Sequence, residues 1–347
     1  MIEFDGNNDQ LEDDDDELYE HYRIVVDKGQ TPMRIDKYLP HHVKNASRTK
    51  IQTAIDTESV KVNDLTVKSS YKVKPFDVIS VSFPHPPRET TELLPENIPL
   101  NIVFEDEDIL IVNKTPEMVV HPGHGNWTGT LVNALVYHFQ NLPTSQNGAI
   151  RPGLVHRIDK GTSGLLVIAK NEYAMQHLAR QFFDHSIERT YYALIWGEPK
   201  DDKGTINAHI GSGYKDRRIS DVFPEGEYGR EAITHYEVLK KMRYVSLIKC
   251  NLETGRTHQI RAHMKYLGHP LFGDASYGGD KILRGNIFTK FKQFIDNCFE
   301  MLPRQALHAK SLGFEHPRTK EWVQFDSELP EDFQSVVDKW EKYVSYE

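Results

Sequence analysis

Cysteine is scarce in this chain, which has only Cys250 and Cys298 in 347 residues. Two thiols are too few for a disulfide framework or a cysteine-based zinc site, and this scarcity favours a reducing, cytoplasmic compartment. Long apolar runs are also missing, since none approaches the roughly 20 residues that span a bilayer. The N-terminus shows neither the basic nor the apolar segment of a secretory signal. We therefore expect a cytoplasmic protein with no membrane partner.

Basic residues are absent from positions 1–20, which hold ten acidic residues. The net charge is -9 for the whole chain, +5 for residues 21–90 and -4 for residues 91–347. The excess of negative charge therefore belongs mostly to the first 20 residues, which we expect to form a disordered acidic tail. The hydrophobic content of 38%, with 16 Phe, 16 Tyr and 4 Trp, suffices for packed cores in the rest of the chain.

Prolines at positions 84, 86 and 87 separate two segments of different character, and the length of the chain suits two domains. We predict a small basic domain over residues 21–84, a linker over 85–91, a larger domain over 92–335 and a C-terminal tail over 336–347.

The basic domain has the pattern of two helices followed by short strands. Residues 34–39 begin like a helix, and Ser47 is a suitable N-cap for a second helix that runs to about Asp56. Alternating apolar residues predict strands over 60–62, 65–67 and 78–83. Cations cluster at the beginning of the second helix, where the helix N-terminus also favours phosphate. The predicted phosphate contacts are Lys44, Arg48 and Lys50.

The larger domain mixes strands and helices without a strict strand–helix alternation, so we predict an α+β fold. The apolar run over 165–169 is typical of a buried strand, and Asn171 is a suitable cap for a helix that continues to about Asp184. Further helices are predicted over 130–140 and 257–267, and further strands over 102–104, 109–112, 189–196, 231–239 and 243–251.

The loop over residues 151–164 carries the densest set of ionisable groups, His156, Arg157, Asp159 and Lys160. It contains three glycines and lies directly before the buried strand, an arrangement typical of functional loops held by a rigid sheet. A surface cluster of ion pairs explains these residues equally well at this point. The loop lacks the spacing of glycines and lysine that a phosphate-binding P-loop requires, so it is not a P-loop.

A second segment, residues 253–265, predicts a helix with one apolar and one basic face. Ile260, Met264 and Leu267 share the apolar face, whereas His258, Arg261 and Lys265 share the other. Such a helix can bury one side and direct a cation at a neighbouring loop. A solvated basic face is the alternative interpretation.

Histidines at 121 and 124 have the His-x-x-His spacing of a metal site. This spacing alone is a weak signal, and no acidic or cysteine ligand lies nearby in the sequence. We predict no bound metal.

Six motifs in a fixed order give the chain a specific resemblance to a known family, the RluA-type pseudouridine synthases. The signature loop is the stretch from His156 to Leu166. The accompanying motifs are Val112-Asn113-Lys114 with Val120-His121-Pro122, Arg189-Thr190-Tyr191-Tyr192-Ala193-Leu194, the stretch from Thr254 to His263, Pro270-Leu271-Phe272-Gly273-Asp274, and Arg304-Gln305-Ala306-Leu307-His308-Ala309. The likeness covers about residues 92–330, whereas segments 212–230 and 279–303 match poorly and are expected to be loops or insertions.

The basic domain resembles the S4-like RNA-binding domain that precedes some of these catalytic domains. The match begins at Arg34-Ile35-Asp36 and continues to Asp77-Val78-Ile79. Three turns depart from the family pattern because glycines usual there are replaced, in the stretches Thr57-Glu58-Ser59, Asn63-Asp64 and Pro75-Phe76-Asp77. Residues other than glycine tolerate left-handed backbone poorly, so these turns are where the geometry is least predictable.

The resemblance implies isomerisation of uridine to pseudouridine in RNA, without a metal or an organic cofactor. It implies a mixed, mainly antiparallel sheet with flanking helices for the catalytic domain. By position in the motifs, Asp159 is the catalytic carboxylate, which attacks C1′, attacks C6 or stabilises a path through a glycal. Arg261 keeps that carboxylate ionised and aligned. Tyr191 stacks on the target base and assists proton transfer.

Three further roles follow from the resemblance. Arg157 enters the space that the flipped uridine leaves, which offsets part of the energy needed to extrude a base. Leu307 lines the base pocket. Lys160 joins Arg157 and Arg261 in a local basic surface for RNA, because the catalytic domain as a whole is acidic.

The expected substrate is large-subunit (23S) ribosomal RNA or its assembly particle, as in the RluC/RluD branch of the family, and the enzyme is expected to be a monomer. Three alternatives remain: a transfer-RNA pseudouridine synthase, a non-catalytic RNA-binding or ribosome-assembly factor, and a nucleoside hydrolase that uses the same carboxylate.

Overall fold

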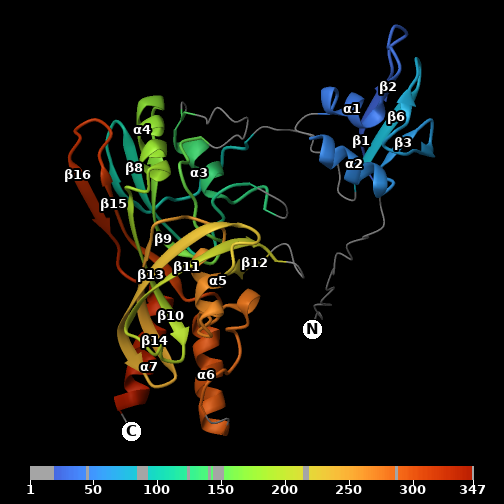
Figure 1. Cartoon of the computed structure of the whole chain (residues 1–347). Helices are drawn as coiled ribbons and strands as arrows, with labels where there is room; N and C mark the ends of the chain where they lie inside the picture. The colour runs from blue at the N-terminus through green and yellow to red at the C-terminus, as the bar shows by residue number, and fades with distance from the viewer. Residues whose placement is uncertain are drawn as a thin grey trace, which may run out of the picture. The chain divides into compact units, whose positions relative to one another are not determined.

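The computed structural model describes residues 19–43, 47–83, 93–122, 126–139, 142–143, 152–213, 219–285 and 288–345. The chain divides into two units, Met1–Glu92 and Leu93–Glu347 (Figure 1). The linker predicted over 85–91 lies outside the described residues, as do positions 1–18 of the predicted acidic tail. Positions 19 and 20 belong to a strand, so the tail predicted over 1–20 is too long by at least these two residues.

The N-terminal unit combines two helices with a four-stranded sheet of order β1-β6-β3-β4. The apolar side chains of residues 35, 39, 51, 55, 60, 62, 79 and 81 form its core, as the predicted helix and strand patterns require. Its elements are β1 (Tyr19–Val25), β2 (Met33–Arg34), α1 (Ile35–Tyr38), the short 3-10 helix η1 (Leu39–His41), α2 (Arg48–Asp56), β3 (Val60–Val62), β4 (Leu65–Thr66), β5 (Lys72–Val73) and β6 (Val78–Phe83).

The three turns that lack the family's glycines all keep the left-handed backbone. Glu58 has a φ of 59°, Asp64 of 64° and Phe76 of 70°. Side chains with a Cβ are strained in this region, most of all bulky ones such as Phe76. The three turns therefore keep the backbone conformation that glycine usually adopts there, and each one carries left-handed strain.

The C-terminal unit is built on a ten-stranded sheet with the path β12-β11-β13-β14-β10-β15-β9-β8-β7, in which β16 pairs with β15. Its strands are β7 (Ile102–Glu105), β8 (Ile109–Lys114), β9 (Ser163–Ala169), β10 (Glu188–Trp196), β11 (Lys203–Ser212), β12 (Ser220–Phe223), β13 (Arg230–Met242), β14 (Val245–Leu252), β15 (Leu307–Glu315) and β16 (Trp322–Asp326). Every pair is antiparallel except β9 with β15. The predicted α+β class with a mainly antiparallel sheet is confirmed.

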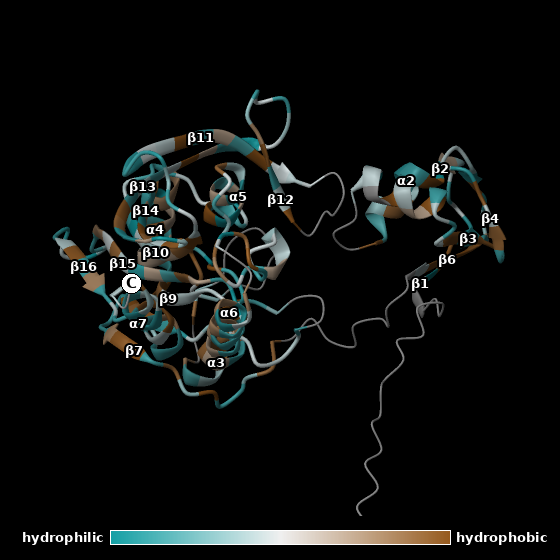
Figure 2. Ribbon diagram, turned by 90° about the horizontal axis from the view of Figure 1, so that it is seen from below, coloured by the Kyte–Doolittle hydropathy of each residue, from teal (hydrophilic) through white to brown (hydrophobic). Residues whose placement is uncertain are grey.

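Helices cover both faces of this sheet (Figure 1). They are α3 (Leu131–His138), α4 (Glu172–Phe183), α5 (Gln259–Tyr266), the 3-10 helix η2 (Ala275–Tyr277), α6 (Thr289–Met301) and α7 (Glu331–Ser345). Because β9 lies between two layers, Leu166 and Ile168 belong to one core and Leu165 and Val167 to another. This double burial explains the continuous apolar run that predicted the strand. By contrast, β11 alternates between hydrophilic and hydrophobic residues along its length (Figure 2).

The C-terminal tail predicted over residues 336–347 is wrong for residues 336–345, which belong to α7. Phe333, Val336, Val337 and Trp340 of this helix are buried against α6 and the sheet. Their spacing of three and four residues is that of one helical face, which holds α7 in the core. Residues 289–301, expected within a loop or insertion, likewise form α6, and Phe291, Ile295 and Cys298 are buried in the same core.

Candidate active site

The backbone of the loop that carries Asp159 is held by three hydrogen bonds, one with a backbone partner and two with side chains. The Gly161 amide donates to Pro116 O at 2.7 Å, Arg304 Nη1 donates to Gly161 O at 2.9 Å, and Gln305 Nε2 donates to Lys160 O at 2.7 Å. At Gly161, φ is +80°, a conformation for which glycine is suited. The loop therefore presents Asp159 in a fixed place at the edge of β9, with its side chain 18% exposed.

A buried lysine supports the neighbouring turn. Lys114 is 1% exposed, and its ammonium donates to Thr115 O and Met118 O, both at 2.7 Å. Burial lowers the pKa of Lys114 to about 7, and the charge of Arg304 acts in the same direction. These bonds close the turn over residues 114–118, which in turn accepts the Gly161 amide through Pro116 O.

Arg261 lies between two carboxylates. Its Nε and Nη2 donate to Asp274 at 2.7 and 2.9 Å, and its Nη1 donates to Asp159 Oδ2 at 3.3 Å. Burial lowers the pKa of Arg261, but the hydrogen bonds and charge of Asp274, together with the charge of Asp159, outweigh it and raise the pKa. Arg261 therefore stays charged although its side chain is only 6% exposed.

His258 approaches the same carboxylate from the residue before α5. Its Nε2 lies 3.8 Å from Asp159 Oδ2, and its Nδ1 lies 3.1 Å from the Tyr277 hydroxyl. That hydroxyl donates to Ser220 O, so His258 Nδ1 is the donor toward Tyr277. Burial lowers the pKa of His258 more than the charge of Asp159 raises it, so the ring is neutral.

Tyr191 lies on β10, where it pairs with Cys250 of β14 and Ala309 of β15. The residue is 8% exposed. Burial raises the pKa of Tyr191 and outweighs the charge of Arg189, which lowers it. The charge of Asp159 raises it further, so the phenol is neutral. The central strand of the sheet thus fixes an aromatic ring beside the carboxylate.

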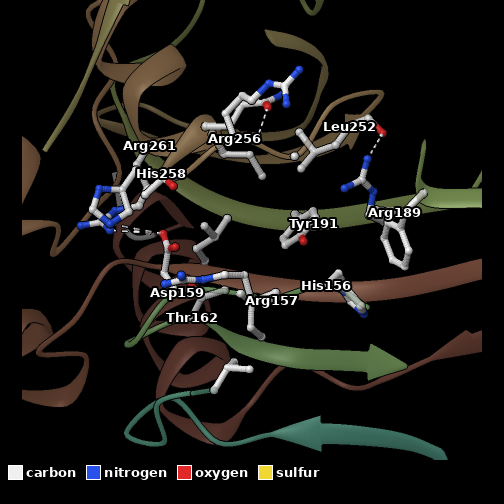
Figure 3. Close-up of a pocket in the computed structure, with 18 of the residues that line it drawn as sticks. His156, Arg157, Asp159, Thr162, Arg189, Tyr191, Leu252, Arg256, His258 and Arg261 are labelled. Carbon is white, nitrogen blue, oxygen red and sulfur yellow. Dashed lines mark hydrogen bonds and ion pairs between the residues drawn. The ribbon is translucent and has the colours of Figure 1, made fainter. Parts of the chain in front are cut away.

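A pocket of about 400 Å³ collects these groups (Figure 3). The sequence-predicted residues that line it are Arg157, Asp159, Tyr191, Arg261 and Leu307. Arg157 is exposed and has no hydrogen bond or ion pair with any described residue. Lys160 does not line the pocket; its ammonium lies 3.3 Å from Asn126 Oδ1.

Several lining residues were not among the sequence-predicted site residues, notably His156, Phe182, Arg189, Arg256 and His258. Arg189 had a signal in the sequence, because it precedes Tyr191 by two residues and so shares its face of the strand. His156 accepts a hydrogen bond from the Val167 amide at 3.0 Å, and burial lowers its pKa to about 3. It is therefore a neutral side chain that anchors the loop.

The predicted phosphate contacts of the N-terminal unit are described only in part. Lys44 and the side chain of Lys50 lie outside the described residues. Arg48 donates through Nε and Nη2 to the buried Asp36 at 3.1 and 2.9 Å, while its own side chain is 51% exposed. Arg34 and Gln52 donate to the same carboxylate, so Arg48 has a structural role in addition to any contact with phosphate.

One cluster of possible metal ligands occurs in the described parts of the chain, namely Asp106, Asp108 and His316. Arg318 donates through Nη2 to Asp108 at 2.7 Å, and His316 Nε2 lies 2.8 Å from Asp106. Asp108 is thus already paired with an arginine of the chain, and Asp106 with an imidazole nitrogen. His124, the second histidine of the His-x-x-His spacing, lies outside the described residues.

The pocket joins one carboxylate and a buried aromatic ring to arginines that differ in exposure. This combination suits a planar, neutral group that is attached to an anionic chain, as a base is in a nucleic acid. The pocket is therefore typical of an enzyme that acts on a nucleic acid. None of the helices in the described ranges combines the length and apolar character needed to cross a bilayer.

The comparisons with known proteins agree with this class. Residues 108–266 match the family described as RNA pseudouridylate synthase, and residues 33–79 match the S4 domain. An uncharacterized RNA pseudouridine synthase of Chlorobaculum parvum is 47% identical over 91% of this chain and 96% of the relative. The chain belongs to the RNA pseudouridine synthases, which confirms the resemblance, and it is an isomerase that acts on RNA.

Two further proteins are similar over most of their length. Ribosomal large subunit pseudouridine synthase D of Zymomonas mobilis is 42% identical over 90% of this chain and 95% of the relative. The solved structure of human RNA Pseudouridylate Synthase Domain Containing 1 has a TM-score of 0.51 and 25% identity, and the match covers 72% of this chain and 96% of that one. The similarity to this relative and to this solved structure therefore extends over most of the chain.

Proposed function

We propose that this enzyme isomerises specific uridines of large-subunit ribosomal RNA in the cytoplasm, and that it acts as a monomer. The observation that carries the chemistry is the contact of 3.3 Å between Asp159 and Arg261 in a pocket shared with Tyr191. The ribosomal substrate is supported by the S4 domain and by the similarity to a relative named as a large-subunit enzyme.

In this proposal Asp159 acts at the sugar or the base of the target uridine, and Arg261 holds it ionised. Tyr191 stacks on the uracil and assists proton transfer, while Leu307 closes the base pocket. All four side chains face one cavity, so a single flipped nucleotide reaches them together.

RNA contacts come from cations outside the Asp159–Arg261 pair. The exposed Arg157 fills the space that the flipped uridine leaves, and Lys160 lies beside it in the same loop. On the N-terminal unit, Arg48 together with Lys44 and Lys50 contacts phosphates. This division separates base chemistry from backbone binding.

The test is a map of pseudouridines in total RNA from cells with and without the gene, followed by complementation. We expect defined sites in large-subunit ribosomal RNA to be lost on deletion, restored by the wild-type gene and not restored by Asp159→Asn. The matched control is Asp338→Asn, which changes an exposed carboxylate on α7 and should restore every site.

The outcomes separate the rival functions. Loss of sites only in transfer RNA would replace the proposed substrate. Full restoration of growth and ribosome assembly by Asp159→Asn, with defects after charge reversal of Arg48 and Lys50, would indicate a non-catalytic assembly factor. Release of free uracil from RNA by the purified protein would indicate a hydrolase.

A further inference from the structure

Arg189 is a buried cation without a carboxylate partner. The residue is 9% exposed, and no described acidic side chain forms an ion pair with it. Burial lowers its pKa below the usual range of an arginine. An uncompensated charge in such a place destabilises a fold, so its presence in a pocket indicates a function for the charge.

The guanidinium is held in place from three sides. Its Nη2 donates to Glu253 O at 3.0 Å and contacts Leu252 O at 3.4 Å. It lies over the ring of Phe182, 5.6 Å from the ring centroid. A Cβ at position 255 would come within 2.8 Å of Nη1, so Gly255 is needed for this close approach.

Three N–H groups of this guanidinium, one on Nε and two on Nη1, have no hydrogen-bond partner among the described residues. Nε is shielded from solvent, whereas Nη1 is not and can therefore be reached from the pocket that Arg189 lines. Buried donors are almost always paired, and an exception in an active-site pocket indicates an acceptor on the substrate. The acceptor would lie in the pocket that Arg189 lines together with Tyr191, two residues further along β10.

Figure 3 places Tyr191 between Asp159 and Arg189, so the carboxylate and the guanidinium lie at opposite ends of the pocket. The walls beside Arg189 are largely flat or apolar, formed by Phe182, Leu252 and the ring of His156, which stacks on Phe182 at 4.7 Å. A planar base fits between such walls better than a hydrated phosphate does.

Isomerisation breaks the C1′–N1 bond of uridine and makes a C1′–C5 bond. When the first bond breaks, its electron pair leaves with the uracil, which becomes an anion with charge on N1, O2 and O4. The base then turns, a ring electron pair forms the bond from C5 to C1′, the C5 proton is lost and N1 gains a proton. If a carboxylate first adds to C6, the electron pair of the C5–C6 double bond moves toward C4 and the negative charge appears on O4. No other reactant is consumed.

We propose that Arg189 is a catalytic residue, whose Nη1–H donates to a carbonyl oxygen of the uracil and stabilises the negative charge that develops there when the base is detached. The inference rests on the proposed placement of the uracil against Tyr191. A preorganised donor in a shielded pocket stabilises charge that appears in the transition state far more than it stabilises the neutral substrate. Asp159 then serves the sugar end of the breaking bond and Arg189 the base end.

The experiment compares Arg189→Gln and Arg189→Met with the wild type under single-turnover conditions, on one RNA that carries uridine and on one that carries 5-fluorouridine at the target. We expect the rate constant on uridine to fall by about 10²–10³-fold with little change in the RNA concentration at half-saturation. Fluorine stabilises the uracil anion by itself. We therefore expect the two substitutions to lower the rate constant for consumption of 5-fluorouridine by a clearly smaller factor than the rate constant on uridine. Arg180→Gln, an exposed arginine of α4 outside the pocket, is the matched control and should behave as wild type.

A loss of equal size on both RNAs overturns the proposal, because a structural role does not depend on the leaving group. A loss confined to RNA affinity, with a reduced salt dependence, also overturns it and assigns Arg189 to a phosphodiester. Thermal melting of both variants guards against unfolding; Arg189→Met keeps the contact with Phe182 and removes the buried charge, so we expect it to fold. A wild-type protein that makes no pseudouridine would refute the proposed function itself, independently of Arg189.

Discussion

Arg261 lies closer to Asp274 than to Asp159. Two hydrogen bonds of 2.7 and 2.9 Å join the guanidinium to Asp274, whereas a single contact of 3.3 Å reaches Asp159. Asp274 is 1% exposed and begins the 3-10 helix η2, whose Tyr277 ring also lies 5.0 Å from the guanidinium. Asp274 is therefore the residue that positions Arg261 for its contact with the catalytic loop.

Asp274→Asn should impair both activity and stability. Loss of the positioning carboxylate moves Arg261, and small misplacements of an active-site group lower rates by up to about 10²-fold. Removal of one partner from a buried ion pair costs about 3–5 kcal/mol. Single-turnover rates and urea unfolding measure the two effects, with Asp338→Asn as the control. An unchanged rate in a folded Asp274→Asn protein would show that Asp159 orients Arg261 without help.

Local patterns in the sequence predicted the helices and strands that are determined by neighbouring residues. Asn171 caps α4, with its Oδ1 accepting the Ala174 amide at 2.9 Å. The helix predicted from Thr257 begins later, at Gln259, because His258 has a left-handed φ of 56° that no periodicity signals. The spacing of Phe333, Val336, Val337 and Trp340 did carry a helical signal for α7, which the interpretation of this segment as a tail overlooked.

The site itself required more than local patterns. Asp159, Tyr191 and Arg261 come from a loop, a central strand and a helix, and only the resemblance to a family predicted that they meet. The link from Arg261 to Asp274 joins two separate motifs, and nothing in either motif alone indicates which carboxylate Arg261 prefers. The sequence places Arg189 on the same strand face as Tyr191. It does not show that Arg189 lacks a carboxylate partner, because this depends on how β14 and α4 pack around it.

Glycine at the strained turns should stabilise the N-terminal unit. Glu58→Gly and Phe76→Gly relieve left-handed strain of about 1–2 kcal/mol, against which the added freedom of glycine in the unfolded chain costs about 0.4–1 kcal/mol. We expect a net gain of about 0.5–1 kcal/mol for each, and less for Asp64→Gly, because Asp tolerates this conformation better. Urea unfolding followed by circular dichroism measures the gain.

Asp56→Gly is the matched control for these three substitutions. Asp56 ends α2 in a helical conformation, so glycine there should destabilise by about 0.5–1 kcal/mol. A loss of stability in all four variants would mean that the side chains of Glu58 and Phe76 contribute contacts that outweigh the strain.

Asp36 should be essential to the stability of the N-terminal unit. The carboxylate is 0% exposed and accepts hydrogen bonds from Arg34, Arg48 and Gln52, which hold its pKa well below the usual range. Asp36→Asn leaves these cations without their partner, and we expect a loss of about 3 kcal/mol in the free energy of unfolding. Asp56→Asn, an exposed neighbour on α2, should change it by less than about 0.5 kcal/mol. Equal effects of the two variants would contradict the assignment.

His308 should make the catalytic unit sensitive to acid. Its Nδ1 lies 2.9 Å from Ser163 Oγ and its Nε2 lies 2.9 Å from Ser327 Oγ, and burial lowers its pKa to about 4. Between pH 6.5 and 4 the unfolded chain binds a proton at this residue and the folded chain does not, so stability falls as the pH falls. The full effect is on the order of 2–3 kcal/mol.

His308→Gln tests this contribution, because its amide can bond to both hydroxyls and does not titrate. Urea unfolding at pH 7 and pH 5 should show a smaller loss of stability in the variant than in the wild type. His156 and His263, whose pKa values burial also lowers, remain in both proteins and cancel in the comparison. Parallel losses in the two proteins would show that His308 carries a proton in the folded state.

Removal of residues 1–18 should leave catalysis intact and strengthen non-specific RNA binding. These positions hold nine acidic residues, which compete with RNA phosphates for the basic surface of the N-terminal unit. The truncation ends before β1, which pairs with β6 from Tyr19 onward. Filter binding to an unrelated RNA at two salt concentrations measures the change, which we expect to be largest at low salt.

A second truncation that removes residues 1–25 separates charge from structure. It takes away β1 and exposes the edge of β6, so we expect the N-terminal unit to lose cooperative unfolding while pseudouridine formation on a short RNA persists. Weaker RNA binding after removal of residues 1–18 alone, with unchanged unfolding, would contradict the competition and give the acidic residues a positive part in RNA recognition.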